Sequence, residues 1–417
     1  MKRMMTAVIA AALPATAFAG EAEVVTNYAN IAEATYGDAL IKAQELDAAI
    51  ADLIANPSEH TLLAAKTAWI AARVPYQQSE VFRFGNPIVD DWEGKVNAWP
   101  LDEGLIDYVD GSYGGATDEN PLAVLNVIAN PTIEISGEEI DATEITPELL
   151  AETLHEADEV EANVSTGYHA IEFLLWGQDL NGTDHGAGAR SYTDYLTGDE
   201  CTGGNCDRRG QYLTAASKLL VSDLEYMVAQ WSEGGEARET VLADPAAGVT
   251  AMLTGMGSLS YGEQAGERMK LGLMLNDPEE EHDCFSDNTH NSHFYDGVGI
   301  HNVYTGQYVR VDGTLVKGES LEDLLASKDP ALAADLTAAV DHSVAELGQI
   351  KAAAEAGFSY DQMLGRGNEA GEELIMTAVD ALVAQTRVIE RAVAVLTASE
   401  IEVEGSDSLD NPEAVFQ

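Results

Sequence analysis

The chain has 417 residues, of which 46% are hydrophobic, so its length and apolar content suffice for roughly two or three ordinary domains. Lys and Arg number 21 against 72 Asp and Glu, which gives a formal net charge of -51. Such a surface repels the phosphates of nucleic acids and anionic lipids and excludes both as partners, while most of its carboxylates form a solvated coat.

The first residues have the pattern of a secretory signal peptide. Lys2 and Arg3 form the charged start, Met4–Leu13 the apolar core, and Ala17-Phe18-Ala19 the cleavage site, so we assign residues 1–19 to the signal. No cysteine follows that could accept a lipid, and no later apolar run is long enough to cross a bilayer. We therefore expect a soluble exported protein, periplasmic if the source is a Gram-negative bacterium. An uncleaved N-terminal anchor is the alternative.

Helical periodicity follows this segment. Apolar residues recur at helical intervals over residues 23–55, which predicts a helix broken near Gly37. A second helix is predicted to begin after Ser58 and to kink or end at Pro75.

Residues 86–145 are irregular, and the pattern there allows short strands at 132–135 and 139–140. Thr146-Pro147 then has the chemistry of a helix start, and the apolar pattern predicts a helix that continues to Gly177, with a kink at Gly167.

A glycine-rich passage, 177–210, follows and is the expected boundary between two halves. Cys201 and Cys206 enclose a flexible Thr-Gly-Gly-Asn turn, and we expect a local disulfide between them. Cys284 is left over and is expected to be a buried thiol.

The second half is predicted to be helical, apart from one hairpin marked by the two-residue turn Asp312-Gly313. The predicted elements are helices over 208–231, 246–275, 320–357 (interrupted) and 368–398, and the hairpin over 304–317. The fold class is therefore all-α, with two packed helical-bundle halves and small β-hairpin decorations. We assign 20–195 to the N-terminal bundle, 196–400 to the C-terminal bundle and 401–417 to a flexible acidic tail.

The strongest candidate site is the sequence Gly167-Tyr168-His169-Ala170-Ile171-Glu172. On a helix His169 and Glu172 are three residues apart and share one face, where they can hold one metal ion or one proton. Their neighbours are almost all apolar, which indicates a buried pair. A purely structural ion pair is the competing interpretation, because a single His-x-x-Glu is a weak pattern.

Further candidates come from distant segments. Arg73 and Glu80 lie among aromatic residues and are expected to belong either to an ion-pair network or to a site. Asp102 follows Trp99-Pro100 in the irregular region. Glu263 and Glu267 are four residues apart, so they can bridge a metal or pair with a basic side chain such as Lys270. His282, Asp287, His290 and His293 form a cluster of potential metal ligands, although such a segment also resembles a helix cap.

These motifs resemble one known family. Gly167 to Glu172 matches the Gly-x-His-x-x-Glu signature of the imelysin-like proteins, and the Trp69–Glu80 stretch is similar to the helix that accompanies it. The segments Ser191–Arg209 and Phe285–Gly306 resemble the longer, iron-regulated protein A branch of that family. The resemblance implies an exported protein of two helical halves with its functional cleft near the signature helix.

The resemblance implies either a metallopeptidase or a protein of iron uptake. For iron, His169, Glu172 and Glu80 supply the nitrogen and oxygen ligands that this metal accepts, with Asp102, Glu263, Asp287 and His290 as further candidates. For a peptidase, zinc would replace iron, and Glu172 or Glu80 would act as general base. A catalytic zinc normally has three protein ligands, whereas the signature supplies only one histidine. We therefore favour iron binding over the peptidase. A metal-free module that binds a peptide or another envelope protein is the third possibility.

Overall fold

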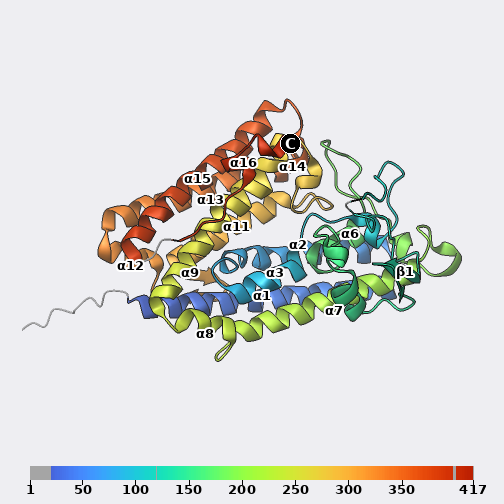
Figure 1. Cartoon of the computed structure of the whole chain (residues 1–417), viewed down its shortest axis with the longest axis horizontal. Helices are drawn as coiled ribbons and strands as arrows, with labels where there is room; N and C mark the ends of the chain where they lie inside the picture. The colour runs from blue at the N-terminus through green and yellow to red at the C-terminus, as the bar shows by residue number, and fades with distance from the viewer. Residues whose placement is uncertain (1–19, 119, 398–400, 417) are drawn as a thin grey trace, which may run out of the picture.

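The computed structural model describes residues 20–118, 120–397 and 401–416. The expected signal peptide, residues 1–19, lies outside these ranges. The fold is all-α, as predicted, and long helices form two bodies that lie against each other (Figure 1). Within the described residues, no helix has both the length and the apolar character that crossing a membrane requires.

One body consists of α1 and the helices around it, and Figure 1 shows α1 and α7 running side by side. Its main helices are α1 (Glu21–Ala55), α2 (Glu59–Gln77), α3 (Pro87–Asn97), α6 (Gly167–Trp176), α7 (Cys206–Trp231) and α8 (Glu236–Leu242). Shorter helical pieces are η1 (Glu80–Phe82), α4 (Glu103–Ile106), α5 (Pro147–Leu149), η2 (Leu150–Leu154), η3 (Ala157–Glu159), η4 (Tyr192–Tyr195) and η5 (Gly198–Glu200). The antiparallel strands β1 (Thr132–Ile135) and β2 (Glu138–Asp141) confirm the predicted first hairpin.

The other body is the bundle in the upper part of Figure 1. It contains α9 (Pro245–Ser258), η6 (Leu259–Leu271), α10 (Gly272–Leu275), η7 (Pro278–Glu280), α11 (Thr289–Thr305), α12 (Leu321–Lys328), α13 (Pro330–Glu355), α14 (Tyr360–Leu364), α15 (Glu369–Leu396), α16 (Asp407–Asp410) and η8 (Ala414–Phe416). The second predicted hairpin is confirmed as β3 (Gln307–Val309) and β4 (Leu315–Lys317). Helix α9 packs against both α1 and α15 and so joins the two bodies.

Helix α1 is continuous, and the predicted break at Gly37 is wrong. Tyr36 is 1% exposed and Asp38 is completely buried, so both residues beside the glycine are fixed by packing. A glycine inside a helix costs only about 1 kcal/mol, which the burial of such side chains offsets. Helix α2 contains Pro75 and ends two residues later, at Gln77, so the predicted end near the proline is confirmed.

The long helix predicted over 146–177 is also wrong. The chain forms α5 and the π-helical turn η2, and then leaves the helical path before α6 begins at Gly167. Glu156, Asp158 and Glu159 have positive φ values, which a right-handed helix does not allow. The Asn163 side chain stabilises this loop by donating to the Ala157 carbonyl at 2.7 Å.

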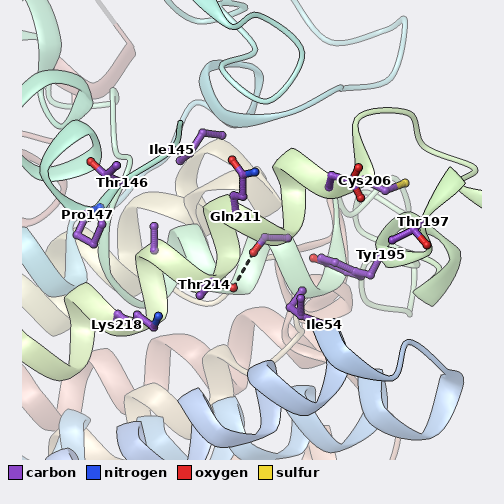
Figure 2. A pocket seen from close by; sticks show the side chains of 13 residues that line it. Ile54, Ile145, Thr146, Pro147, Tyr195, Thr197, Cys206, Gln211, Thr214 and Lys218 are labelled. Carbon is purple, nitrogen blue, oxygen red and sulfur yellow. Dashed lines mark hydrogen bonds between the residues drawn. The ribbon is translucent and has the colours of Figure 1, made fainter. Parts of the chain in front are cut away.

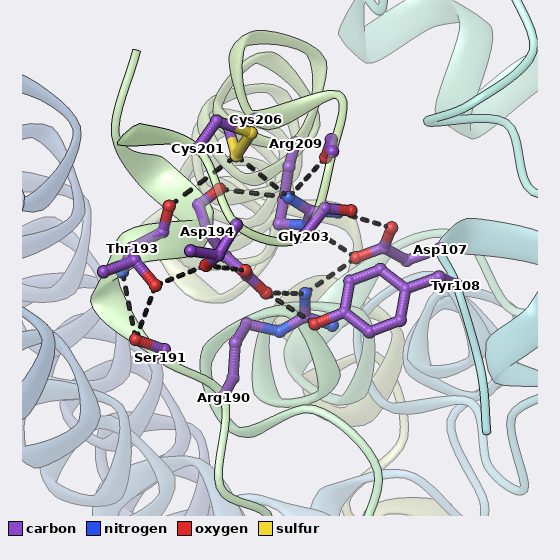
Figure 3. Close-up of a disulfide and its surroundings, with 12 residues drawn as sticks. Asp107, Tyr108, Arg190, Ser191, Thr193, Asp194, Cys201, Gly203, Cys206 and Arg209 are labelled. Carbon is purple, nitrogen blue, oxygen red and sulfur yellow. Dashed lines mark hydrogen bonds and ion pairs between the residues drawn. A yellow bond between two sulfur atoms is a disulfide. The ribbon is translucent and has the colours of Figure 1, made fainter. Parts of the chain in front are cut away.

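The packing does not follow the expected division at residues 195 and 196. Helix α7 begins after that point but packs against α1 and α6 of the first body. Figure 3 shows one of the contacts that hold α7 there: the side chain of Arg209, on α7, binds both carboxylate oxygens of Asp107, at 2.6 and 2.9 Å. The structure therefore changes from one body to the other near α9.

The expected flexible tail is instead packed against η6. Ser408 is 1% exposed and donates its hydroxyl to the Gly266 carbonyl at 2.9 Å. The backbone N–H of Glu404 donates to the Ser258 hydroxyl at 3.2 Å. Gly262 and Gly266 allow this approach because each has tail atoms within 3 Å of where a Cβ would stand.

Candidate metal centre

Helix α6 carries the signature residues, and Gly167 determines where it starts. Gly167 is the first helical residue, with φ +76°, and a Cβ there would lie 2.4 Å from the Val96 carbonyl oxygen. Only glycine combines this backbone conformation with such close packing on α3. The glycine of the motif thus places the following turn of helix deep inside the molecule.

His169 and Glu172 face each other in the interior, as the sequence predicted. His169 is 1% exposed and Glu172 is completely buried, and His169 Nδ1 lies 3.1 Å from Glu172 Oε2. The other carboxylate oxygen, Glu172 Oε1, accepts hydrogen bonds from the Ser286 backbone N–H at 3.0 Å and from its hydroxyl at 2.6 Å. His169 Nε2 is buried and has no hydrogen-bond partner.

Asp283 is the third member of the group. One ligand atom from each of His169, Glu172 and Asp283 lies within 4.8 Å of the others. The guanidinium of Arg73 binds Asp283 at 2.7 Å, and Ser292 and Asn288 also donate to this carboxylate. The segment before α11 therefore closes over the signature helix and supplies both Asp283 and Ser286.

The electrostatics keep His169 neutral. Burial, helped by the positive charge of Arg73, lowers the pKa of His169 to about 3. Burial and the nearby Asp283 raise the pKa of Glu172 well above its usual value. Burial opposes the charge on Asp283 as well, but Arg73 and the hydrogen bonds outweigh it and lower the Asp283 pKa. A neutral imidazole with an unpaired ring nitrogen is the form that binds a metal.

Glu80 and Glu263 are not part of this group. Arg268 binds Glu80 at 2.7 Å, Glu263 at 2.7 Å and Asp296 at 3.1 Å. Of the two expectations for Glu80, the ion-pair network is the one observed. Glu263 likewise pairs with a basic side chain, that of Arg268. The π-helical path of η6 explains this pairing, because hydrogen bonding from i to i+5 brings residues five apart onto one face.

The remaining candidates lie elsewhere, except for one histidine. Asp102 accepts hydrogen bonds from Tyr113 and Asn120. His290 Nε2 contacts Asn291 at 3.0 Å. Asp287 belongs to a separate carboxylate group with Asp179 and Asp361. His282 does lie beside the centre, its ring centroid 5.0 Å from that of His169, but its nitrogens contact Gln77 and Asn97.

Sequence reasoning missed Asp283 and Ser286. Both lie more than 100 residues after the motif, and nothing in their local pattern distinguishes them from the histidines around them. One signal for Asp283 was present in the sequence: Arg73 lies between Trp69 and Tyr76, a setting that predicts burial. A buried arginine keeps its charge and therefore requires a carboxylate partner.

Two further features lie outside the centre: a disulfide and a surface cavity. Cys201 and Cys206, the first residue of α7, form the disulfide expected from their spacing, with the sulfurs 1.99 Å apart (Figure 3). Figure 2 shows a surface cavity of about 390 Å³ between α1, α5 and α7, lined by residues such as Ile54, Pro147 and Lys218. None of its lining residues belongs to the group around His169.

Comparison with known proteins agrees with this architecture. A crystal structure assigned as an iron-regulated protein A precursor from Parabacteroides distasonis superposes with a TM-score of 0.64 at 19% identity, covering 92% of this chain and 97% of that one. An imelysin-like protein from Psychrobacter arcticum gives 0.57 at 17% identity, covering 92% and 96%. Curated proteins provide no match. At these identities the two structures establish a shared fold.

The sequence itself establishes the family. The profile of the imelysin (peptidase M75) family matches residues 32–389, which is most of the chain and includes the whole signature helix. The chain therefore belongs to the imelysin family.

Proposed function

We propose that this protein binds iron at His169 and Glu172, with Asp283 beside them, and serves iron uptake or homeostasis outside the cytoplasm. One observation carries the proposal: His169 Nε2 is buried, has no hydrogen-bond partner and belongs to a group with two carboxylates. Buried polar atoms are almost always paired, so an unpaired imidazole nitrogen beside acidic oxygens points to a cation.

The ligand chemistry supports iron. Imidazole nitrogen and carboxylate oxygen suit iron, and the centre offers no thiolate that would favour a softer metal. Zinc remains the alternative metal, because it accepts the same ligands. The structural neighbour from Parabacteroides is named an iron-regulated protein, and the signal-like first residues support an exported, periplasmic location.

The burial of the centre favours metal binding over peptide hydrolysis. A zinc peptidase must bring a peptide bond to an open metal position. His169 and Glu172 are 1% and 0% exposed, and Asp283 is already bound by Arg73. An ion needs only a small opening to reach such a site, whereas a peptide must displace the whole segment that contains Ser286. The same burial argues against a metal-free module that binds a peptide or envelope protein.

Iron titration tests the proposal. We expect the purified protein to bind Fe²⁺ without oxygen, or Fe³⁺ supplied as citrate in air, with one saturable site. His169→Ala should weaken this site by more than the roughly 10–100-fold that loss of an outer-shell partner costs. The matched control is His342→Ala, since the His342 side chain is 58% exposed on α13. Iron binding that survives unchanged in His169→Ala would contradict the proposal.

A second measurement separates binding from hydrolysis. The protein loaded with Fe²⁺ or Zn²⁺ is incubated with unfolded proteins, with and without a chelator. We expect no metal-dependent cleavage. Cleavage that a chelator stops and Glu172→Gln abolishes would show that the peptidase alternative is correct.

A further inference from the structure

A second group of acidic side chains lies apart from the iron centre. Asp179, Asp287 and Asp361 each offer a ligand oxygen, and these atoms all lie within 4.8 Å of one another. They come from three segments: the loop after α6, the segment before α11, and α14. The carboxyl group of Glu281 faces that of Asp361, which makes it a fourth member.

The innermost carboxylates of this group face one another. Glu281 is completely buried and Asp361 is 1% exposed, and no oxygen of either residue has a hydrogen-bond donor in ordinary geometry. Their carboxyl groups instead interact with each other and, for Asp361, with that of Asp287. Oδ1 of Asp287 is also unpaired. Leaving a buried acceptor unsatisfied costs about 1–3 kcal/mol, and more for a charged group. Such a cluster therefore requires a cation or added protons.

Other buried carboxylates of this protein are neutralised by arginine. Arg73 binds Asp283, Arg209 binds Asp107, and Arg268 binds Glu80. For Glu281, Asp287 and Asp179, the charges that act on each carboxyl group are those of other acidic residues. Burial first, and then this mutual repulsion, raises the pKa of Asp287 to about 8 and that of Asp179 to about 6. Within the described residues, the group thus lacks the compensation that the protein uses elsewhere.

We propose that Asp179, Glu281, Asp287 and Asp361 form a binding site for one calcium ion. Calcium binds six to eight oxygens and accepts carboxylates in either monodentate or bidentate geometry, which suits carboxylates that come from separate segments of the chain. Zinc sites in proteins usually include at least one nitrogen or sulfur ligand, and none belongs to these four carboxylates. A cavity of about 10 Å³ lies beside two of the four carboxylates, Asp179 and Asp361, and is lined also by Glu279 and Cys284. It has room for no more than one water or ion.

The position of this site gives the ion a structural role. Glu281 and Asp287 flank the short stretch that contains Asp283 and Ser286, the two residues that close the iron centre. A cation that joins them to Asp361 on α14 and Asp179 behind α6 would hold this stretch against both bodies of the fold. Calcium would then stabilise the closed form of the centre without touching iron.

Calcium binding to the chelator-treated protein tests the inference, by calorimetric titration and by thermal unfolding with CaCl₂. We expect one saturable site and a clear rise in Tm in the wild type. Asp361→Asn should lose both, whereas Asp312→Asn, an exposed turn residue of the β3–β4 hairpin, should retain both. His169→Ala should also retain calcium binding, so failure of the iron proposal and failure of this one are distinguishable.

The calcium-free proteins provide the folding control. Because Asp361→Asn removes one of several repelling charges, its Tm without calcium should equal or exceed that of the wild type. The inference is overturned if calcium leaves the wild-type Tm unchanged, or if Asp361→Asn shows the wild-type response. Either result would mean that added protons neutralise the group or that calcium binds only to the general acidic surface.

Discussion

At the scale of single residues, the interior of this protein contains ionisable groups whose charge is set by their partners. Glu93, on α3, illustrates this. Its carboxylate accepts a hydrogen bond from Asn97 at 2.9 Å and lies 3.5 Å from Arg83. Burial, and the negative charges of Glu80 and Glu263, raise its pKa from 4.5 to about 7, although Arg83 and Arg268 oppose the rise. Below about pH 7, Glu93 therefore favours the protonated form in the folded state.

The raised pKa of Glu93 predicts a specific pH dependence. A group with a folded pKa above its unfolded value stabilises the fold below the unfolded pKa, and this stabilisation disappears as pH rises through the folded pKa. The window here is 4.5 to about 7. Glu93→Gln keeps the acceptor for Asn97 but cannot ionise. Relative to wild type it should gain about 2 kcal/mol of unfolding free energy between about pH 5 and about pH 8.

Urea denaturation at the two pH values measures this gain. The control is Glu138→Gln on β2, where the side chain is exposed and the difference from wild type should not change with pH. If Glu93→Gln loses stability relative to wild type as pH rises, the carboxylate is charged and stabilising, and this account of the Arg83 and Arg268 cluster is wrong.

At the scale of elements, the sequence correctly predicted the helices and turns that depend mainly on residues close together in the chain. The Asp312-Gly313 turn indicated the β3–β4 hairpin, and the apolar repeat of residues 208–231 indicated α7 within two residues. The inward orientation of His169 and Glu172 followed from their spacing and apolar neighbours.

Features that depend on distant partners could not be predicted. Asp283 joins the centre only because the segment before α11 folds back over α6. The π-helical path of η6 has no recognisable sequence pattern, and it decides that Glu263 pairs with Arg268. The loop before α6 was predicted as helix because its apolar residues fit a helical repeat, whereas Asn163 and positive φ values determine its real course.

The packed C-terminal segment yields the prediction at this scale. A Cβ on Gly266 would lie 2.3 Å from Ser406 Cβ. Gly266→Ala should therefore displace the tail from η6 and release its backbone. A glutamate-specific protease, whose target side chains Glu402 and Glu404 are already exposed, should then remove the tail faster than in wild type. In the double variant Gly266→Ala/Ser406→Gly the clash is absent, so protection should return. Equal cleavage of wild type and Gly266→Ala would show that the tail is not held by this contact.

At the scale of the whole molecule, charge is distributed very unevenly between interior and surface. Arg73, Arg190, Arg209 and Arg268 are all at most 7% exposed and bind buried acids. Each of these arginines is buried together with an acid, so the exterior keeps the large acidic excess of a chain with 21 basic residues against 72 acidic ones. Repulsion between surface carboxylates therefore opposes the compact state, while the arginine pairs inside are shielded from solvent.

This distribution predicts that salt stabilises the protein. Raising NaCl from about 0.1 M to about 1 M shortens the Debye length from about 10 Å to about 3 Å, which screens repulsion across the surface but leaves the buried pairs almost unaffected. The Tm measured by calorimetry, with chelator present so that trace calcium does not contribute, should rise over this range. The control is an equal osmolality of an uncharged solute, which reproduces general solvent effects without screening. If Tm falls as NaCl increases, attractive ion pairs at the surface outweigh the repulsion, and the acidic coat is a stabilising network.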